Sequence, residues 1–378
     1  MGIILYFVLF LLIIMSLYNI TRNSQNELSN ITFSFKQVHW SFFLIASLIF
    51  YVLIRTVSYD TGADYLAYYN HFVTRSRNLI DVWGEGREIG YQYLIDFLSS
   101  YFGKPNIFFA LCAILGMGTL TMVSMKFGKA APYIVLGWVL YMFNLSMNLY
   151  RQYLAMSLIF CALYFQINFS HKRKHIIYSS VCVILAYLFH HSSAIGVLML
   201  ILIFMLRKYK IKKWVFISML LITTISAMTV LSNFFSLIGS YFDAYIAMND
   251  RGYSASEMLD SMYDTGKMAY VNMLCGAIFI WYGDRVLNDS VTLRYFYLIF
   301  VICLIITPLT QEEILMRMRL YLTNFSVIGY GLIVYFNKRL YSLKSNLPLF
   351  GVIIYQFLYM FIYQNSLLFE SFPIQFKY

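Results

Sequence analysis

The chain has 378 residues, of which 61% are hydrophobic and only 12% are charged, with a formal net charge of +11. Soluble domains carry about 25% charged residues, so this composition excludes an ordinary soluble protein and indicates a polytopic helical membrane protein. The basic excess does not indicate nucleic-acid binding, because its clusters lie in short loops between apolar runs. The five cysteines lie inside apolar runs without CxxC spacing, which is typical of small core residues.

Apolar runs long enough to cross a bilayer core of about 30 Å recur along the chain. We predict an all-α fold with about twelve transmembrane helices, forming a single domain over residues 1–378. The apolar segment 89–102 is shorter and contains Asp96, so we expect a re-entrant or interfacial helix on the outer face. The expected spans are 2–20, 38–58, 105–125, 131–148, 152–169, 175–189, 191–206, 214–238, 268–283, 294–309, 314–336 and 347–365.

The loop charges orient these spans. The basic loops 171–174 and 207–213 should both be cytoplasmic, since Lys and Arg are retained on that side. The polar break 190–193 then forms an outer turn between two short apolar arms, and both chain termini lie outside. This topology places 17 of the 28 Lys and Arg residues inside and 14 of the 17 Asp and Glu residues outside.

Polar and aromatic side chains therefore gather on the outer face, where the loops 59–104 and 239–267 are expected to form the site. Each feature also has a structural interpretation: Arg55 could pair with Asp60, and polar residues on one helical face could simply join helices. Asn144, Asn148 and Arg151 have the spacing of one such face. The candidate site residues are Arg55, Asp60, Asp64, Tyr65, Tyr68, Glu88, Arg151, Gln152, His190, His191, Arg317 and Arg319.

This set of side chains suits a lipid-linked saccharide. Arginine forks bind phosphate oxygens, a carboxylate or a histidine can take a proton from a sugar hydroxyl, and tyrosine rings stack on sugars. No DxD, HExxH, GxSxG or P-loop motif occurs, so we expect neither a metal nor a cofactor. Several arginines could instead neutralise the charge of a leaving group.

A series of short motifs resembles the EpsG-like family of bacterial polysaccharide proteins, which is similar to Wzy-type O-antigen and exopolysaccharide polymerases. The resemblance rests on Arg55, Asp60-Thr-Gly-Ala-Asp64-Tyr65, Tyr68, Glu88-Ile-Gly-Tyr91, Arg151-Gln-Tyr-Leu-Ala155 and His190-His191-Ser-Ser-Ala194. Arg317-Met-Arg319-Leu-Tyr321 and Phe372-Pro373 are weaker matches. Together the motifs follow the family order along nearly the whole chain.

The resemblance implies a glycosyltransferase in the bacterial inner membrane. It would transfer a growing glycan from undecaprenyl diphosphate to a hydroxyl of an incoming lipid-linked repeat unit at the outer face. In this interpretation Asp64, or Asp60, is the preferred base, while Arg151 with Arg317 or Arg319 holds the diphosphate. His190 or His191 is a second proton carrier or phosphate ligand.

The remaining residues of the candidate set would bind the substrate, and a chain-length regulator and a flippase are possible partners. Two alternatives remain: a transferase that uses a polyprenyl-phosphate sugar, and a lipid-linked saccharide flippase. A flippase should carry charges along a central cavity, whereas the middles of the predicted spans are almost free of charge.

Overall fold

A computed structural model describes Val8 and residues 11–15, 42–59, 64–77, 88–167, 173–227, 267–310, 313–359 and 375–376. In these residues the fold is helical apart from one short antiparallel pairing, in which β1 (Ser58–Tyr59) faces β2 (Gln375–Phe376). Asp60 and nearly all of the predicted outer loop 239–267 lie outside the described residues.

Most of the helices overlap the predicted apolar runs, whereas the helix Tyr65–Ser76 follows no such run and most of the predicted span 2–20 lies outside the described residues. The longer ones are α2 (Phe42–Val57), α3 (Tyr65–Ser76), α4 (Ile89–Phe102), α5 (Asn106–Met125), α6 (Ala131–Tyr141), α8 (Tyr150–Gln166), α9 (Arg173–Phe189), α10 (Ser193–Leu206), α11 (Lys213–Ser226), α14 (Lys267–Leu287), α15 (Val291–Ile306), α16 (Glu313–Leu340) and α17 (Leu343–Tyr359). Short turns of helix are η1 (Gly128–Ala130), α7 (Phe143–Ser146) and η3 (Thr307–Leu309).

Among the described residues, two helical segments are long and apolar enough to cross a membrane, Asn106–Met125 and Val291–Leu309. Helices α2, α10 and α11 are apolar but shorter. Large apolar side chains are also exposed, for example Ile184 of α9 and Ile222 of α11. Such outward-facing apolar surfaces are typical of helices that face lipid. The number of twelve crossings stays a prediction.

The predicted span 131–148 is not one continuous helix, so the prediction that Asn144, Asn148 and Arg151 share one helical face was wrong. Helix α6 ends at Tyr141, and α7 adds one turn from Phe143 to Ser146. Leu149 then has φ −97° and ψ 55°, outside the helical region, so the chain turns before α8 begins. Asn144, Asn148 and Arg151 therefore do not share the face of a continuous helix.

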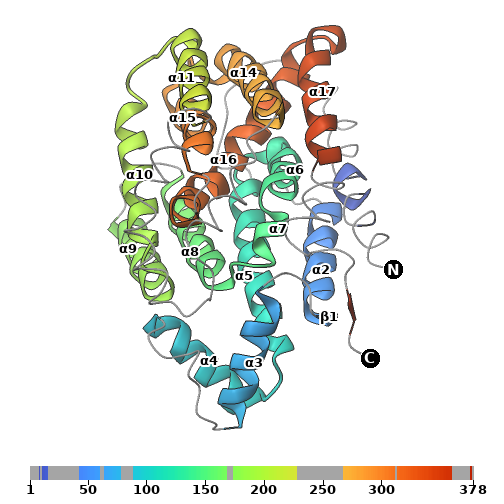
Figure 1. Cartoon of the computed structure of the whole chain (residues 1–378), viewed down its shortest axis with the longest axis vertical. Helices are drawn as coiled ribbons and strands as arrows, with labels where there is room; N and C mark the ends of the chain where they lie inside the picture. The colour runs from blue at the N-terminus through green and yellow to red at the C-terminus, as the bar shows by residue number, and fades with distance from the viewer. Residues whose placement is uncertain are drawn as a thin grey trace. The chain divides into compact units, whose positions relative to one another are not determined.

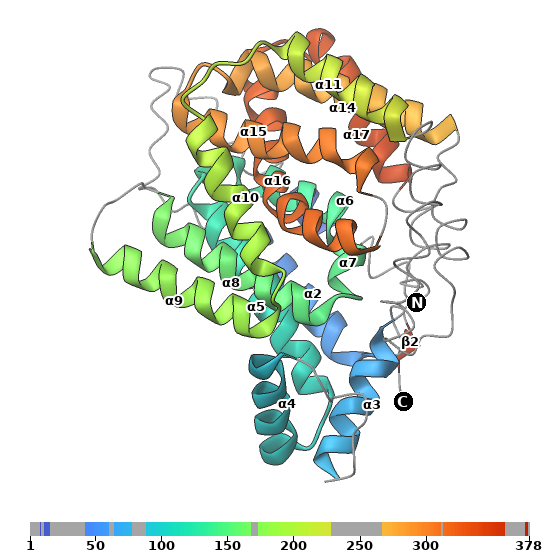
Figure 2. The same ribbon diagram turned by 60° about the vertical axis from the view of Figure 1, so that its left-hand side comes forward.

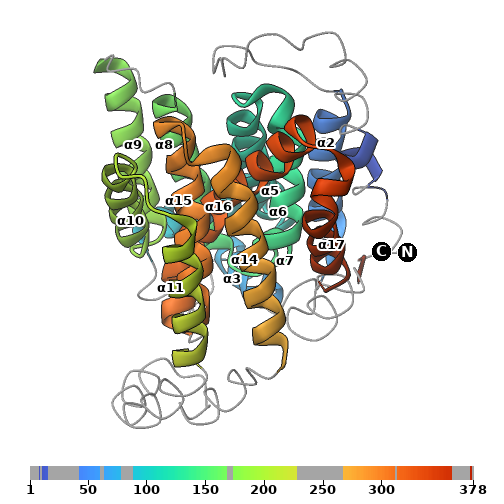
Figure 3. The ribbon, with the colours of Figure 1, turned by 90° about the horizontal axis from the view of Figure 1, so that it is seen from above.

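The chain divides into two compact units. Unit 1 comprises residues 1–198, 330–335 and 353–378, and unit 2 comprises residues 199–329 and 336–352. In unit 1, α5 packs against α2 and α8, and α8 packs along α9 (Figure 3). Helices α3 and α4 pack together beyond the end of α5 (Figures 1 and 2). Between them, Arg75 of α3 pairs with Asp96 of α4 at 3.7 Å.

An aromatic cluster joins α3 and α4 to the longer helices of unit 1. The ring of Tyr65 stacks on Phe109 with centroids 4.4 Å apart, and the ring of Tyr68 meets Tyr150 edge-on at 4.9 Å. Both tyrosines are buried. Aromatic pairs of this geometry stabilise by about 0.5–1.5 kcal/mol beyond their buried area. Tyr65 and Tyr68 therefore hold α3 against α5 and α8.

Unit 2 is built on the packing of α11, α14 and α15 (Figure 3). Arg294, at the start of α15, is buried and donates to the carbonyl oxygens of Asn288 at 2.7 Å and Arg207 at 3.0 Å. Asn288 in turn donates to the carbonyl oxygen of Ile211 at 2.9 Å. These bonds fix the basic loop 207–213 against the α14–α15 connection.

Candidate functional site

Glu88 is the centre of a polar cluster in unit 1. It precedes α4 in extended conformation, with φ −61° and ψ 136°, and its side chain makes no capping bond to that helix. A side-chain acceptor at this position usually binds the free N–H groups of the first turn. The Glu88 carboxylate instead contacts Arg151 through Oε2 and His190 through Oε1.

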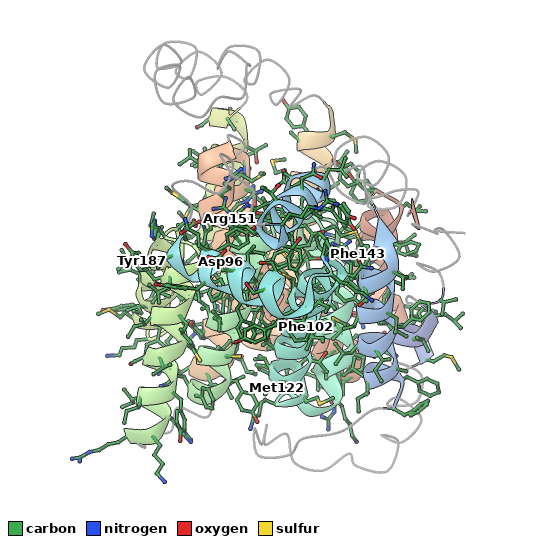
Figure 4. All side chains as sticks on the ribbon, turned by 90° about the horizontal axis from the view of Figure 1, so that it is seen from below. Asp96, Phe102, Met122, Phe143, Arg151 and Tyr187 are labelled. Atoms are coloured by element: carbon green, nitrogen blue, oxygen red, sulfur yellow. The ribbon has the colours of Figure 1, made fainter. Side chains whose placement is uncertain are left out.

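Arg151 lies in the first turn of α8. Its Nη1 donates to Glu88 Oε2, and its Nε donates to the Tyr68 hydroxyl at 3.4 Å. The guanidinium carbon lies 5.6 Å from the centre of the Tyr91 ring, a cation–π contact. The side chain of Arg151 is only 12% exposed. Figure 4 looks onto the end of unit 1 that carries α3 and α4, and labels Arg151.

His190 follows α9, in the turn that the polar break predicted. Its Nδ1 lies 2.5 Å from Glu88 Oε1, and the side chain is 15% exposed. The neighbouring His191 is exposed, with its ring 4.9 Å from the ring of Tyr187. The sequence left open which histidine belongs to the site, and in the structure only His190 of the two contacts Glu88.

Gly90 brings these groups together. A Cβ built at this position would lie 2.8 Å from the carbonyl oxygen of Leu188, closer than real Cβ contacts. The start of α4 therefore lies directly against the last turn of α9, which packs against it. This backbone contact places Glu88, two residues before Gly90, beside His190, two residues after Leu188.

Electrostatics keep Glu88 ionised. Burial alone would raise the pKa of Glu88, but the hydrogen bond from His190 and the charge of Arg151 outweigh it and lower the pKa to about 2. The opposite holds for Tyr68, where burial outweighs the charge of Arg151 and raises the pKa of the hydroxyl. At neutral pH the cluster therefore contains an ionised carboxylate, a guanidinium and a neutral phenol.

The other predicted residues of unit 1 lie in α2, in α8 and around the start of α3. Asp64 lies just before α3, where its carbonyl oxygen accepts from the Tyr68 N–H at 3.3 Å. Tyr65 packs in the aromatic cluster, and Gln152 is buried in α8. Arg55 is buried at the end of α2, where it donates to the Tyr150 hydroxyl. The proposed pair of Arg55 with Asp60 falls outside the described residues, and the predicted sugar contact of Tyr65 stays a prediction.

Arg317 and Arg319 belong to unit 2, in the first turns of α16. Arg319 donates from Nη1 to the carbonyl oxygen of Thr307 at 3.1 Å. Their predicted contact with a diphosphate stays a prediction. Within the described residues, no three His, Cys, Asp or Glu side chains are grouped closely enough to hold a metal ion.

Two contributors were not among the predicted site residues. Tyr91 supports the guanidinium of Arg151, and Tyr150 receives the hydrogen bond from Arg55. Both stand inside or beside short motifs that the sequence analysis singled out, Glu88-Ile-Gly-Tyr91 and Arg151-Gln-Tyr-Leu-Ala155. Adjacency to those motifs was the available signal, but in a chain with 34 tyrosines the residue type alone did not distinguish them.

A model of the EpsG family matches residues 40–373, which is nearly the whole chain and includes every residue of the cluster. No curated protein and no solved structure matches the chain.

Proposed function

We propose, from the premise that this chain belongs to the EpsG family, that it is a polysaccharide polymerase. The family connects the chain with membrane proteins of exopolysaccharide biosynthesis. The proposed reaction transfers a growing glycan from undecaprenyl diphosphate to a hydroxyl of an incoming lipid-linked repeat unit. The proposed location is the outer face of the bacterial inner membrane, with the chain crossing about twelve times and both termini outside.

One observation carries this proposal. Glu88, Arg151 and His190 come from segments far apart in the chain and meet in one largely buried cluster. A buried carboxylate that binds a guanidinium and an imidazole combines an anion-binding group with a proton-transfer group. Glycosyl transfer from a diphosphate needs both, because negative charge develops on the leaving group while a hydroxyl loses its proton.

The leaving group would be held by arginine. Nε and Nη1 of Arg151 bind Tyr68 and Glu88, so in this proposal the diphosphate is bound by Nη2. Arg317 and Arg319 are the further proposed ligands of the diphosphate. The chain needs no metal in this scheme, since guanidinium groups stabilise developing phosphate charge.

The test is to delete the gene for this chain from the host strain and to analyse the lipid-linked oligosaccharides that accumulate. A polymerase defect leaves complete single repeat units that an impermeant reagent reaches from the outer face. Complete units confined to the cytoplasmic face would show a flippase, and units that lack one sugar would show a single-sugar transferase. Normal polymer in the deletion strain would refute all three functions. Restoration of long chains by the wild-type gene is the control.

A further inference from the structure

The hydrogen bond between Glu88 and His190 fixes the tautomer of the histidine. An ionised carboxylate only accepts hydrogen bonds, and the ion pair with Arg151 keeps the Glu88 carboxylate ionised. The proton in the contact of 2.5 Å must therefore lie on Nδ1 of His190. In the neutral imidazole, Nε2 then carries the lone pair and can accept a proton.

The orientation of the imidazole is fixed as well. Arg151 holds the second oxygen of Glu88, so the carboxylate is bound on both sides. Arg151 is in turn held by Tyr68 and Tyr91. A partner that binds one nitrogen of a histidine sets the direction of the other nitrogen.

The Glu88 carboxylate lies between the guanidinium of Arg151 and the imidazole of His190. Before the reaction, the positive charge of Arg151 offsets the negative charge of Glu88. When His190 gains a proton, the imidazolium lies directly against the Glu88 carboxylate, which stabilises the new charge. Among the described residues, the ion-pair contacts at His190 lead to Glu88 at the start of α4 and through it to Arg151 of α8, while His191 is adjacent in sequence.

We propose that His190 is the catalytic base of the polymerisation reaction and that Glu88 is the positioning residue that holds it. This inference rests on the proposed function and moves the role of base from Asp64 to His190. His190 Nε2 takes the proton of the acceptor hydroxyl while the acceptor oxygen bonds to the anomeric carbon of the donor glycan. The bond from that carbon to the diphosphate oxygen breaks, and undecaprenyl diphosphate leaves with the electron pair. The imidazolium then releases its proton to water.

The experiment measures elongation of lipid-linked oligosaccharides, extracted from a strain that lacks the chain, by purified full-length protein in lipid vesicles. His190→Ala should lower kcat by about 10²–10⁴-fold with little change in KM, as expected when a base is lost. Added imidazole should restore part of the kcat of His190→Ala, because it can occupy the space of the ring. Glu88→Gln should lower kcat by about 10–100-fold, the usual effect of losing a group that orients a histidine.

Two variants separate catalysis from folding. In His190→Asn, the side-chain amide keeps a donor for Glu88 but has no nitrogen that can accept the proton. This protein should fold like the wild type and remain inactive. His191→Ala is the matched control, because its exposed side chain lies outside the cluster, and it should keep the wild-type kcat. Glu88→Gln combined with His190→Ala should be no slower than His190→Ala alone, since both changes remove one function.

Wild-type kcat in His190→Asn would overturn the assignment while the proposed function stands. The same holds if His190→Ala folds normally but imidazole restores nothing and Asp64→Asn alone abolishes elongation. If the wild-type protein itself elongates no lipid-linked oligosaccharide, the proposed function fails, and the assignment fails with it.

Discussion

Replacing Gly90 by alanine should separate α4 from α9 and open the contact between Glu88 and His190. The new Cβ would lie 2.8 Å from the Leu188 carbonyl oxygen and 2.9 Å from its carbonyl carbon. Ordinary van der Waals contact begins at 3.4 Å, so the start of α4 must withdraw by about 0.6 Å, the difference between 3.4 and 2.8. The opposing atoms belong to the backbone, so no side-chain rotation can relieve the overlap.

The energetic consequence can be worked from three terms. Forced overpacking costs about 1–3 kcal/mol. A withdrawal of 0.6 Å takes the contact between Glu88 and His190 from 2.5 Å beyond the usual length of a charge-assisted bond, which loses about 1–2 kcal/mol. Alanine stabilises a helix by about 0.5–1 kcal/mol relative to glycine, which offsets part of this loss. The net destabilisation is about 1–4.5 kcal/mol. Because Glu88 no longer orients His190, activity should fall by at least about tenfold.

The assay compares the thermal unfolding midpoint in detergent with the elongation rate in vesicles. Gly118→Ala is the matched control, because Gly118 also lies in a helix of unit 1 but a Cβ there meets nothing within 4 Å. The control should be as stable as the wild type or slightly more stable, with unchanged activity. If Gly90→Ala matched Gly118→Ala in both measurements, the argument that the α4–α9 contact positions Glu88 would be refuted.

Three further predictions concern Arg151, Glu88 and the membrane topology. Arg151→Lys keeps the positive charge but loses the planar guanidinium that binds phosphate through two nitrogens, so most polymerisation should be lost while the protein still inserts into the membrane. Polysaccharide chains of wild-type length from this variant would exclude two-nitrogen binding of the diphosphate by Arg151. Because the pKa of Glu88 is lowered from 4.5 to about 2 in the folded protein, the ionised carboxylate stabilises the fold above pH 4.5, and this stability is lost as the pH falls toward 2. The stability of Glu88→Gln should therefore depend less on pH over this range than that of the wild type. Equal acid sensitivity of the two proteins would contradict the ion pairing. A cysteine introduced at Lys208 should react with an impermeant reagent only from the cytoplasmic side. A cysteine introduced at Ser254, which lies outside the described residues, should react only from the outer side. The reverse pattern would reject the predicted topology.

The sequence by itself determined where the helices lie. Backbone polar groups must be satisfied inside a bilayer, so long apolar runs have little choice but to form helices. The polar break at 190–193 interrupts one such run, and the structure ends α9 at Phe189 and begins α10 at Ser193. The short motifs also marked Glu88, Arg151 and His190, because charged and polar side chains are expensive beside apolar spans and therefore stand out.

Only the tertiary structure decided which of these groups meet. Nothing in the local pattern distinguished His190 from His191, since the difference arises from the packing of α9 on α4 at Gly90. The turn at Leu149 could not be predicted for a related reason: hydropathy does not report a change of backbone dihedral angles within an apolar run. The aromatic partners of Tyr65 and Tyr68, Phe109 and Tyr150, also became known only from the structure, because they come from distant helices. Contacts between distant segments depend on the shapes of both packed surfaces. The pattern of residues along the sequence does not contain information about these shapes.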